Sequence, residues 1–237
     1  MLKLFDSYNL RARISPGIIL LAPIIFPIYL FVPEIRNLSS TVITLIICFG
    51  ICNLIISFSR TLGGKTKEYC FPDMYPAQEM LLPSDNSLDE QTKLRYQAFL
   101  CNHLSNISFC GTDVENKKSS NTAIKWLISR TRDAESFPLI HEENINFGFA
   151  CNLYGMKTIG IISCSIIAVA EIIALYLSSN NTITSFSLRN LLISAIITEL
   201  FLSMWVFMVT KNWVQETGRR YGRALLSACD SKLLNSD

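Results

Sequence analysis

Four long stretches that are almost free of charged residues constrain this chain more than any other feature of its sequence. They cover residues 14–33, 37–59, 158–188 and 190–210. The first two contain no formal charge, and the last two contain one acid each, Glu171 and Glu199. A helix needs about 20 apolar residues to cross the roughly 30 Å core of a bilayer. Each stretch is therefore long enough to span a membrane.

A helix buried in a soluble core is the alternative for any one of these stretches, but it fails for the set. The remaining residues of a 237-residue chain could not cover four such helices. Only 17% of the residues are charged, against about 25% in soluble domains. The first stretch is too long and too rich in proline for a signal peptide, and no A-x-A-like cleavage site follows it. The sequence predicts an all-α membrane protein with four transmembrane helices.

Lysines and arginines gather on one side of this four-span layout. The two short loops on the other side hold only Arg36 and Arg189. By the positive-inside rule, we expect both termini and the long segment between the second and third spans in the cytoplasm. The protein would then be a multi-pass protein of the inner (plasma) membrane. Because the cytoplasm is reducing, structural disulfides are not expected among the eight cysteines.

The spans divide the chain into five expected segments. These are an amphipathic lead-in (1–13), a transmembrane hairpin (14–59), a small helical cytosolic domain (60–156), a second transmembrane hairpin (157–210) and a basic tail (211–237). Arginines alternate with apolar residues in the lead-in and the tail, which favours contact with acidic lipid headgroups. The candidates for this contact are Arg11, Arg13, Arg219, Arg220 and Arg223. A simple charged anchor is the alternative for the lead-in.

The central domain is expected to contain three helices. Ser87-Leu88-Asp89-Glu90 fits a capping box with the serine as the cap, and it predicts a helix that runs to about Leu104. Residues 102–120 look like a polar loop, and a second helix is expected over 122–132. A third helix is expected to begin near Pro138 and to lead towards the third span, since proline suits the first helical position.

The sequence lacks the usual signals of catalysis. It has no Walker A loop and no G-x-S-x-G, H-E-x-x-H or C-x-x-C motif. Cys101, His103 and Cys110 lack the paired spacing of a zinc site. The segment 60–156 holds ten basic and twelve acidic residues, so it lacks the charge of a nucleic-acid surface. We therefore expect no enzyme activity, no cofactor, no metal and no direct binding of nucleic acid.

Glu171 and Glu199 carry the best functional signal. An ionisable residue inside a span is costly and marks a functional site by default. At 1.5 Å of rise per residue, the two carboxyls would lie at a similar depth in the bilayer. The sequence thus makes both glutamates candidates for an ion path. The alternative is a protonated glutamate that forms a hydrogen bond across the hairpin, and the sequence does not decide between the two.

The stretch 137–149 concentrates polar groups directly before the third span. It contains Glu142, Glu143, Asn144 and Asn146, which are candidates for contact with a signal or a partner. Residues three apart share a helix face, so Glu143 and Asn146 could act together. The alternative is a capped helix whose polar groups hydrogen-bond at the membrane entrance, and it is the stronger of the two interpretations.

Two stretches carry a resemblance to known proteins. The first is Arg11–Gly17, and the second runs from Phe137–Ile140 through Gly155–Lys157. Both resemble a group of uncharacterised bacterial four-span membrane proteins, which have an arginine-rich lead-in and an "F-P-L…E-N-I-N-F/Y-G" stretch before a late span. This resemblance implies a four-span layout and no activity. The layout is also similar to that of membrane effectors of bacterial antiviral systems, which pair a few spans with a cytosolic sensing domain.

These observations lead to one hypothesis and one rival. The hypothesis is a homo-oligomeric membrane effector or channel, in which a cytosolic partner protein or a small molecule triggers an ion path past Glu171 and Glu199. The rival is a membrane anchor that recruits a cytosolic partner and does not conduct. Membrane lipids are expected partners in both cases.

Overall fold

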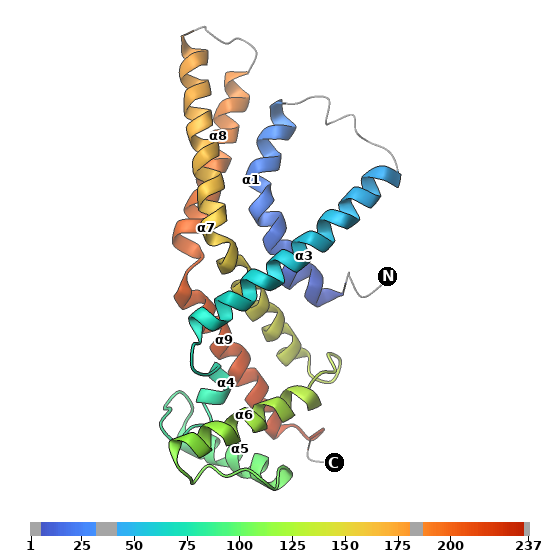
Figure 1. Cartoon of the computed structure of the whole chain (residues 1–237), viewed down its shortest axis with the longest axis vertical. Coiled ribbons are helices and arrows are strands. Elements are labelled where there is room, and N and C mark those ends of the chain that lie inside the picture. The colour runs from blue at the N-terminus through green and yellow to red at the C-terminus, as the bar shows by residue number, and fades with distance from the viewer. Residues whose placement is uncertain (1–5, 32–41, 181–186, 235–237) are drawn as a thin grey trace. The chain divides into compact units, whose positions relative to one another are not determined.

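Every regular element in the described part of the chain is helical. The computed structural model describes residues 6–31, 42–180 and 187–234, without the side chains of 42–52. Eight α-helices lie in these ranges (Figure 1). They are α1 (Ser15–Phe31), α3 (Val42–Cys70), α4 (Pro76–Glu79), α5 (Glu90–His103), α6 (Asp113–Arg130), α7 (Pro138–Ser179), α8 (Leu188–Ser203) and α9 (Lys211–Leu226). Two π-helical segments, η2 (Asn9–Ile14) and η3 (Met204–Met208), and the 3-10 helix η4 (Ser227–Asp230) complete the order.

Three helical stretches are long and apolar enough to cross a membrane. They are Asn9–Phe31, Pro138–Ser179 and Leu188–Met208. The first, second and third of these correspond to the expected first, third and fourth spans. The expected second span, 37–59, lies partly outside the described residues, because 37–41 are not described and 42–52 are described as helical backbone alone. The candidate spans indicate a multi-pass membrane protein.

The chain divides into two compact units. The first comprises Met1–Thr66 and Gly148–Trp213, and the second comprises Lys67–Phe147 and Val214–Asp237. We call them the span unit and the second unit. The span unit contains the three candidate spans for most of their length. The second unit contains α4, α5, α6 and nearly all of α9.

Helices of the span unit approach one another closely where one of them has a glycine. A Cβ atom built on Gly155 of α7 would lie 2.8 Å from the backbone carbonyl of Leu62 in α3. A Cβ on Gly160 would overlap the indole ring of Trp205, which is fully buried. Small residues allow this approach because the helices then pack backbone against backbone. The core between these helices contains Leu20, Leu153, Met156, Cys164, Trp205 and Val209.

The π-helical segment η2 is fixed by side chains of two other helices. Asn152 of α7 donates a hydrogen bond of 2.6 Å to the carbonyl of Ala12. Ser59 of α3 donates one of 2.8 Å to the carbonyl of Arg13. Both donors are buried, so they satisfy carbonyl groups away from water. The segment expected as a surface lead-in therefore continues directly into α1 from Asn9 onwards.

The second unit has its own apolar core. Its buried members come from α4 to α7, α9 and η4 and from the segments that follow α4, α5 and η4, and they include Met80, Leu81, Leu100, Leu127, Ile140, Leu225 and Leu226. Gly222 lets α9 lie against the start of α4, because a Cβ there would be 2.9 Å from the backbone nitrogen of Ala77. Asp230 of η4 accepts hydrogen bonds from Arg95 and Tyr96 of α5 at 3.0 and 3.1 Å.

Two local expectations for this unit were wrong. The cap of α5 is Asp89 and not Ser87, since the Asp89 carboxylate accepts a 2.8 Å bond from the backbone nitrogen of Thr92. The expected polar loop 102–120 ends earlier, because α6 begins at Asp113 behind a capping box of Thr112 and Glu115. The expected start of a helix near Pro138 is confirmed, and so is its continuation towards the third span. Both belong to the single helix α7.

Candidate functional site

The candidate site lies where α7 and α8 meet in the span unit. Figure 1 shows the two helices running side by side. Gly160 of α7 lies against Trp205, and Glu171 of α7 contacts Thr198, so the two segments run antiparallel. The buried face of α8 contains Leu191, Ser194 and Thr198. This spacing of three and four residues places all three side chains on one side of the helix. Two hydroxyl groups therefore face α7.

Glu171 of α7 is buried against these hydroxyls, with 6% of its surface exposed. Its Oε1 atom accepts hydrogen bonds from Ser194 Oγ and, at 3.1 Å, from Thr198 Oγ1. Its Oε2 atom is also buried and has no hydrogen-bond partner among the described residues. A buried carboxyl oxygen without a partner is energetically costly. A hydrogen-bond donor or a cation beside this second oxygen would satisfy it.

An apolar cavity of about 360 Å³ adjoins this carboxyl. Helices α1, α7 and α8 line it with Ile24, Pro27, Ile28, Phe31, Ile166, Ile167, Ala170, Glu171, Ala174 and Leu191. Glu171 is the one ionisable residue in this lining. No charged residue other than Glu171 occurs in 158–188. The setting therefore offers the Glu171 carboxyl no oppositely charged partner from its own stretch of helix.

Glu199 lies in a different setting. It follows Thr198 by one residue on α8, and its side chain is exposed in the single chain. One residue along a helix turns a side chain by about 100°, so Glu199 leaves the face that Thr198 and Ser194 share. The structure thus brings Glu171 together with the hydroxyls of α8, and it places Glu199 on the outer surface of the same candidate span.

The polar residues before the third span lie at the start of α7, in the second unit. Glu142, Glu143, Asn144 and Asn146 are all half-buried. Glu143 Oε2 is a buried atom without a hydrogen-bond partner among the described residues. Asn144 lines a cavity together with Phe147 and Tyr221. Asn144 therefore lies in the wall of this cavity.

The arginines expected at lipid headgroups lie at exposed or half-exposed positions. Arg11 is exposed, and Arg13 is held by a 2.6 Å hydrogen bond to Asn9 and lies 5.1 Å from the ring centroid of Tyr8. Arg219 and Arg223 both approach Glu216, at 3.8 and 4.0 Å. Arg220 is exposed as well. The buried face of α9 packs within the second unit, so the amphipathic pattern of this helix has a use besides lipid contact.

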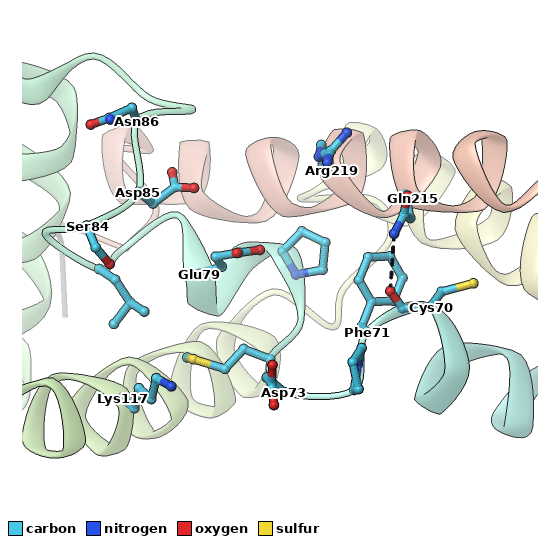
Figure 2. A pocket seen from close by; sticks show the side chains of 14 residues that line it. Cys70, Phe71, Asp73, Glu79, Ser84, Asp85, Asn86, Lys117, Gln215 and Arg219 are labelled. Atoms are coloured by element: carbon cyan, nitrogen blue, oxygen red, sulfur yellow. Dashed lines mark hydrogen bonds between the residues drawn. The ribbon is translucent and has the colours of Figure 1, made fainter.

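A polar groove of about 510 Å³, which we did not predict from the sequence, lies in the second unit (Figure 2). Carboxylates of Asp73, Glu79 and Asp85 line it, and so do the cations Lys117 and Arg219. Its wall is closed in part by a 3.4 Å hydrogen bond from Gln215 to the carbonyl of Cys70. The prolines at 72, 76 and 83 were the one available signal, since they mark an irregular segment. Mixed charge gives this groove no clear preference for a ligand.

The described residues contain no cluster of three or more histidine, cysteine, aspartate or glutamate side chains that could hold a metal ion. The candidate site therefore consists of a buried carboxyl, two hydroxyls and an apolar cavity between candidate spans. These features define the class of the chain as a helical protein with several candidate membrane spans. No family model, no curated protein and no solved structure matches the chain.

Proposed function

We propose that this chain is a multi-pass membrane protein that conducts cations along a path containing Glu171, in an assembly of several copies. The observation that carries the proposal is the Glu171 carboxyl, which is buried inside a candidate span with one oxygen held by two hydroxyls and the other without a partner among the described residues. A small cation would meet a carboxyl that Ser194 and Thr198 already keep in place, so its binding would require little structural change.

Glu199 supports the part of the proposal that concerns assembly. A carboxyl exposed on a spanning helix would face lipid in a single copy, and about 2.5–3.5 kcal/mol is the insertion cost of an acid at the helix centre. Contact with another copy of the chain, or with water in a path between copies, removes that cost. The four-span layout with both termini and the second unit in the cytoplasm belongs to the same proposal, and it rests on the charge distribution.

Membrane potential in cells tests the proposal. The parent chain, Glu171→Gln, Glu199→Gln and the control Glu68→Gln are expressed at equal membrane abundance. Glu68 is an exposed glutamate near the end of α3 that belongs to the second unit and is not among the residues that line the Glu171 cavity. We expect the parent and the control to depolarise cells and Glu171→Gln to reduce the effect by about tenfold or more, as loss of a charged pathway residue would. Depolarisation equal to that of the parent in both span variants, or none by the parent, would refute the ion path.

A membrane anchor without conduction is the second candidate, and one observation favours it. Glu171 Oε1 already accepts two hydrogen bonds from α8, which is what a protonated glutamate with a structural role would do. An amide in its place keeps the acceptor oxygen, so an anchor should tolerate Glu171→Gln with full partner recruitment. The comparison of glutamine variants therefore separates the two functions.

The proposal also includes a role in bacterial antiviral defence, which rests on the resemblance of the layout to membrane effectors of such systems. Plating of phages on cells with and without the parent chain tests it. Protection that disappears in Glu171→Gln and persists in Glu68→Gln would join the defence role to the ion path. Equal plaque numbers with and without the parent chain, across a panel of phages, would remove the defence role and leave conduction to its own test.

A further inference from the structure

A second cavity, of about 360 Å³, lies wholly within the second unit. Five helical regions form it: the end of α3, the segment around α4, the middle of α6, the start of α7 and the middle of α9. Polar and charged groups line it at Lys67, Tyr75, Gln78, Asn121, Lys125, Asn144 and Tyr221, and most of the remaining lining is apolar. This volume is in the range of small-molecule sites.

Aromatic rings form one wall of this cavity. The rings of Phe147 and Tyr221 stack with their centroids 6.0 Å apart and an angle of 18° between their planes. Gly218 of α9 makes room for this wall, because a Cβ atom there would be 3.1 Å from Phe147 Cε2 and 2.8 Å from Phe71 Cζ. Tyr221 is half-buried and Phe147 is only 4% exposed, so Tyr221 provides most of the ring surface on which an aromatic ligand can stack.

Positive charge is the second feature of the cavity. Lys67 and Lys125 line it, and the described residues of its lining include no aspartate or glutamate. The Lys67 ammonium lies 5.1 Å from the centroid of the Phe147 ring, so cation and aromatic wall are adjacent. No salt bridge joins either lysine to a carboxylate of the described residues. An anion in the cavity would therefore meet two ammonium groups without a competing internal partner.

Hydrogen bonds hold two side-chain amides, those of Gln78 and Asn121, in the wall of the cavity. Gln78 accepts a 3.0 Å hydrogen bond from the backbone nitrogen of Tyr75, and its amide donates one of 2.9 Å to Asn121. These bonds hold two amides in the wall before any ligand arrives. A wall that is already in place lowers the conformational cost of binding.

We infer that this cavity binds a small organic anion that carries an aromatic ring, with the ring on Tyr221, which Phe147 supports, and the negative group near Lys67 and Lys125. Binding itself does not depend on the ion path. The role of this ligand as the signal that the second unit receives rests on the proposed function. The inference gives that signal a chemical class and gives Asn144 a place in the wall that recognises it.

Equilibrium dialysis of the full chain in phosphatidylcholine nanodiscs tests the inference, with empty nanodiscs to correct for uptake by lipid. The probe is naphthalene-2-sulfonate, and 2-naphthalenemethanol is the neutral molecule with the same rings. The variants are Lys67→Gln/Lys125→Gln, the single exposed Lys125→Gln and Tyr221→Leu. Lys118→Gln is the matched control, because Lys118 is an exposed lysine of α6 that does not line this cavity.

We expect saturable binding of the sulfonate, with affinity about tenfold lower in the double lysine variant, as for loss of hydrogen bonds to a charged group. Lys125→Gln should show part of this loss, and Lys118→Gln should stay within about twofold of the parent, as for a distant surface charge. Tyr221→Leu should weaken both probes. Absence of saturable binding, equal loss in Lys118→Gln, or unchanged affinity in both cavity lysine variants would overturn the inference. Conductance is not measured, so failure here is distinct from failure of the ion path.

Discussion

Thr198 donates a 3.1 Å hydrogen bond to Glu171 and so joins the two candidate spans α7 and α8 through buried side chains. Ser194 donates to the same carboxyl oxygen from one turn earlier on α8. The two donors lie on one face of α8 and the acceptor lies on α7, so together they set the register and the rotation of α8 against α7. The candidate site is therefore also a point at which the helix pair is held together.

Removal of both donors should weaken this pair. Ser194→Ala combined with Thr198→Val keeps most of the side-chain volume but leaves the buried Glu171 carboxyl without its hydroxyl partners. We expect the free energy of unfolding to fall by about 1–3 kcal/mol, the usual effect of a buried polar group left unpaired. Unfolding in mixed detergent micelles, followed by circular dichroism, measures this change in the free energy of unfolding. Ser203→Ala, at an exposed position of the same helix, is the control, and an equal loss in that variant would contradict the structural role of the two bonds.

The sequence predicted the membrane site only in part. Glu171 stood out because a single acid in a long apolar stretch is rare. Helix depth could be estimated from rise per residue, but rotation about the helix axis could not. Glu171 and Glu199 were therefore expected together, whereas the structure buries one and exposes the other. The sequence shows hydroxyl side chains four residues apart at Ser194 and Thr198. Many serines and threonines in this region have similar spacings, so this pair did not stand out.

The second unit shows why local signals mislead when several compete. Ser87 and Asp89 both precede a helix, and the cap is Asp89 because its carboxylate meets the nitrogen of Thr92. The early start of α6 depends on Thr112 and Glu115, whose reciprocal bonds fit a capping box that was there to be found. The packing of α9 within this unit depends on contacts between distant parts of the chain, which periodicity does not encode.

Cysteine labelling tests the orientation expected from charge. Cys110 is exposed and Cys101 half-buried, whereas Cys70, Cys151 and Cys229 are buried and should react slowly. A membrane-impermeant maleimide should label the chain in permeabilised cells, and Cys110→Ser should remove most of that labelling. Intact cells should show none that depends on Cys110. Labelling of intact cells that disappears in Cys110→Ser would place the second unit outside and reverse the orientation.

The Cys229 thiol should make stability depend on alkaline pH. Burial raises the pKa of Cys229 to about 12, and the nearby Asp230 carboxylate acts in the same direction. An unfolded cysteine has a pKa of about 8.5, so above that pH the unfolded state loses its proton first. The stability associated with the neutral thiol is complete below about pH 8.5 and is lost as the pH rises towards the folded pKa.

The expected decrease is at most about 1.4 kcal/mol per pH unit for this one group. Melting temperatures of the full chain in detergent and reductant, between about pH 8 and 10.5, measure it over the range where only the unfolded thiol ionises. The parent should lose stability more steeply than Cys229→Ala. Burial also raises the pKa of Tyr96, so some alkaline loss should remain in that variant. Cys110→Ala, an exposed thiol, should keep the slope of the parent, and equal slopes in all three chains would contradict the prediction.

Two glycines of the span unit should respond in opposite directions to the same substitution. A Cβ at Gly155 of α7 would lie 2.8 Å from the backbone carbon and oxygen of Leu62, whereas a Cβ at Gly64 of α3 meets nothing within 4 Å. Backbone atoms cannot move aside by changing a rotamer, so Gly155→Ala must push the helices apart and should destabilise the chain by about 1–3 kcal/mol. Gly64→Ala adds helix propensity without a clash and should stabilise it by up to about 1 kcal/mol. Melting temperatures of the two variants in the same detergent measure both effects. A stabilising Gly155→Ala would show that α3 and α7 do not pack at this distance.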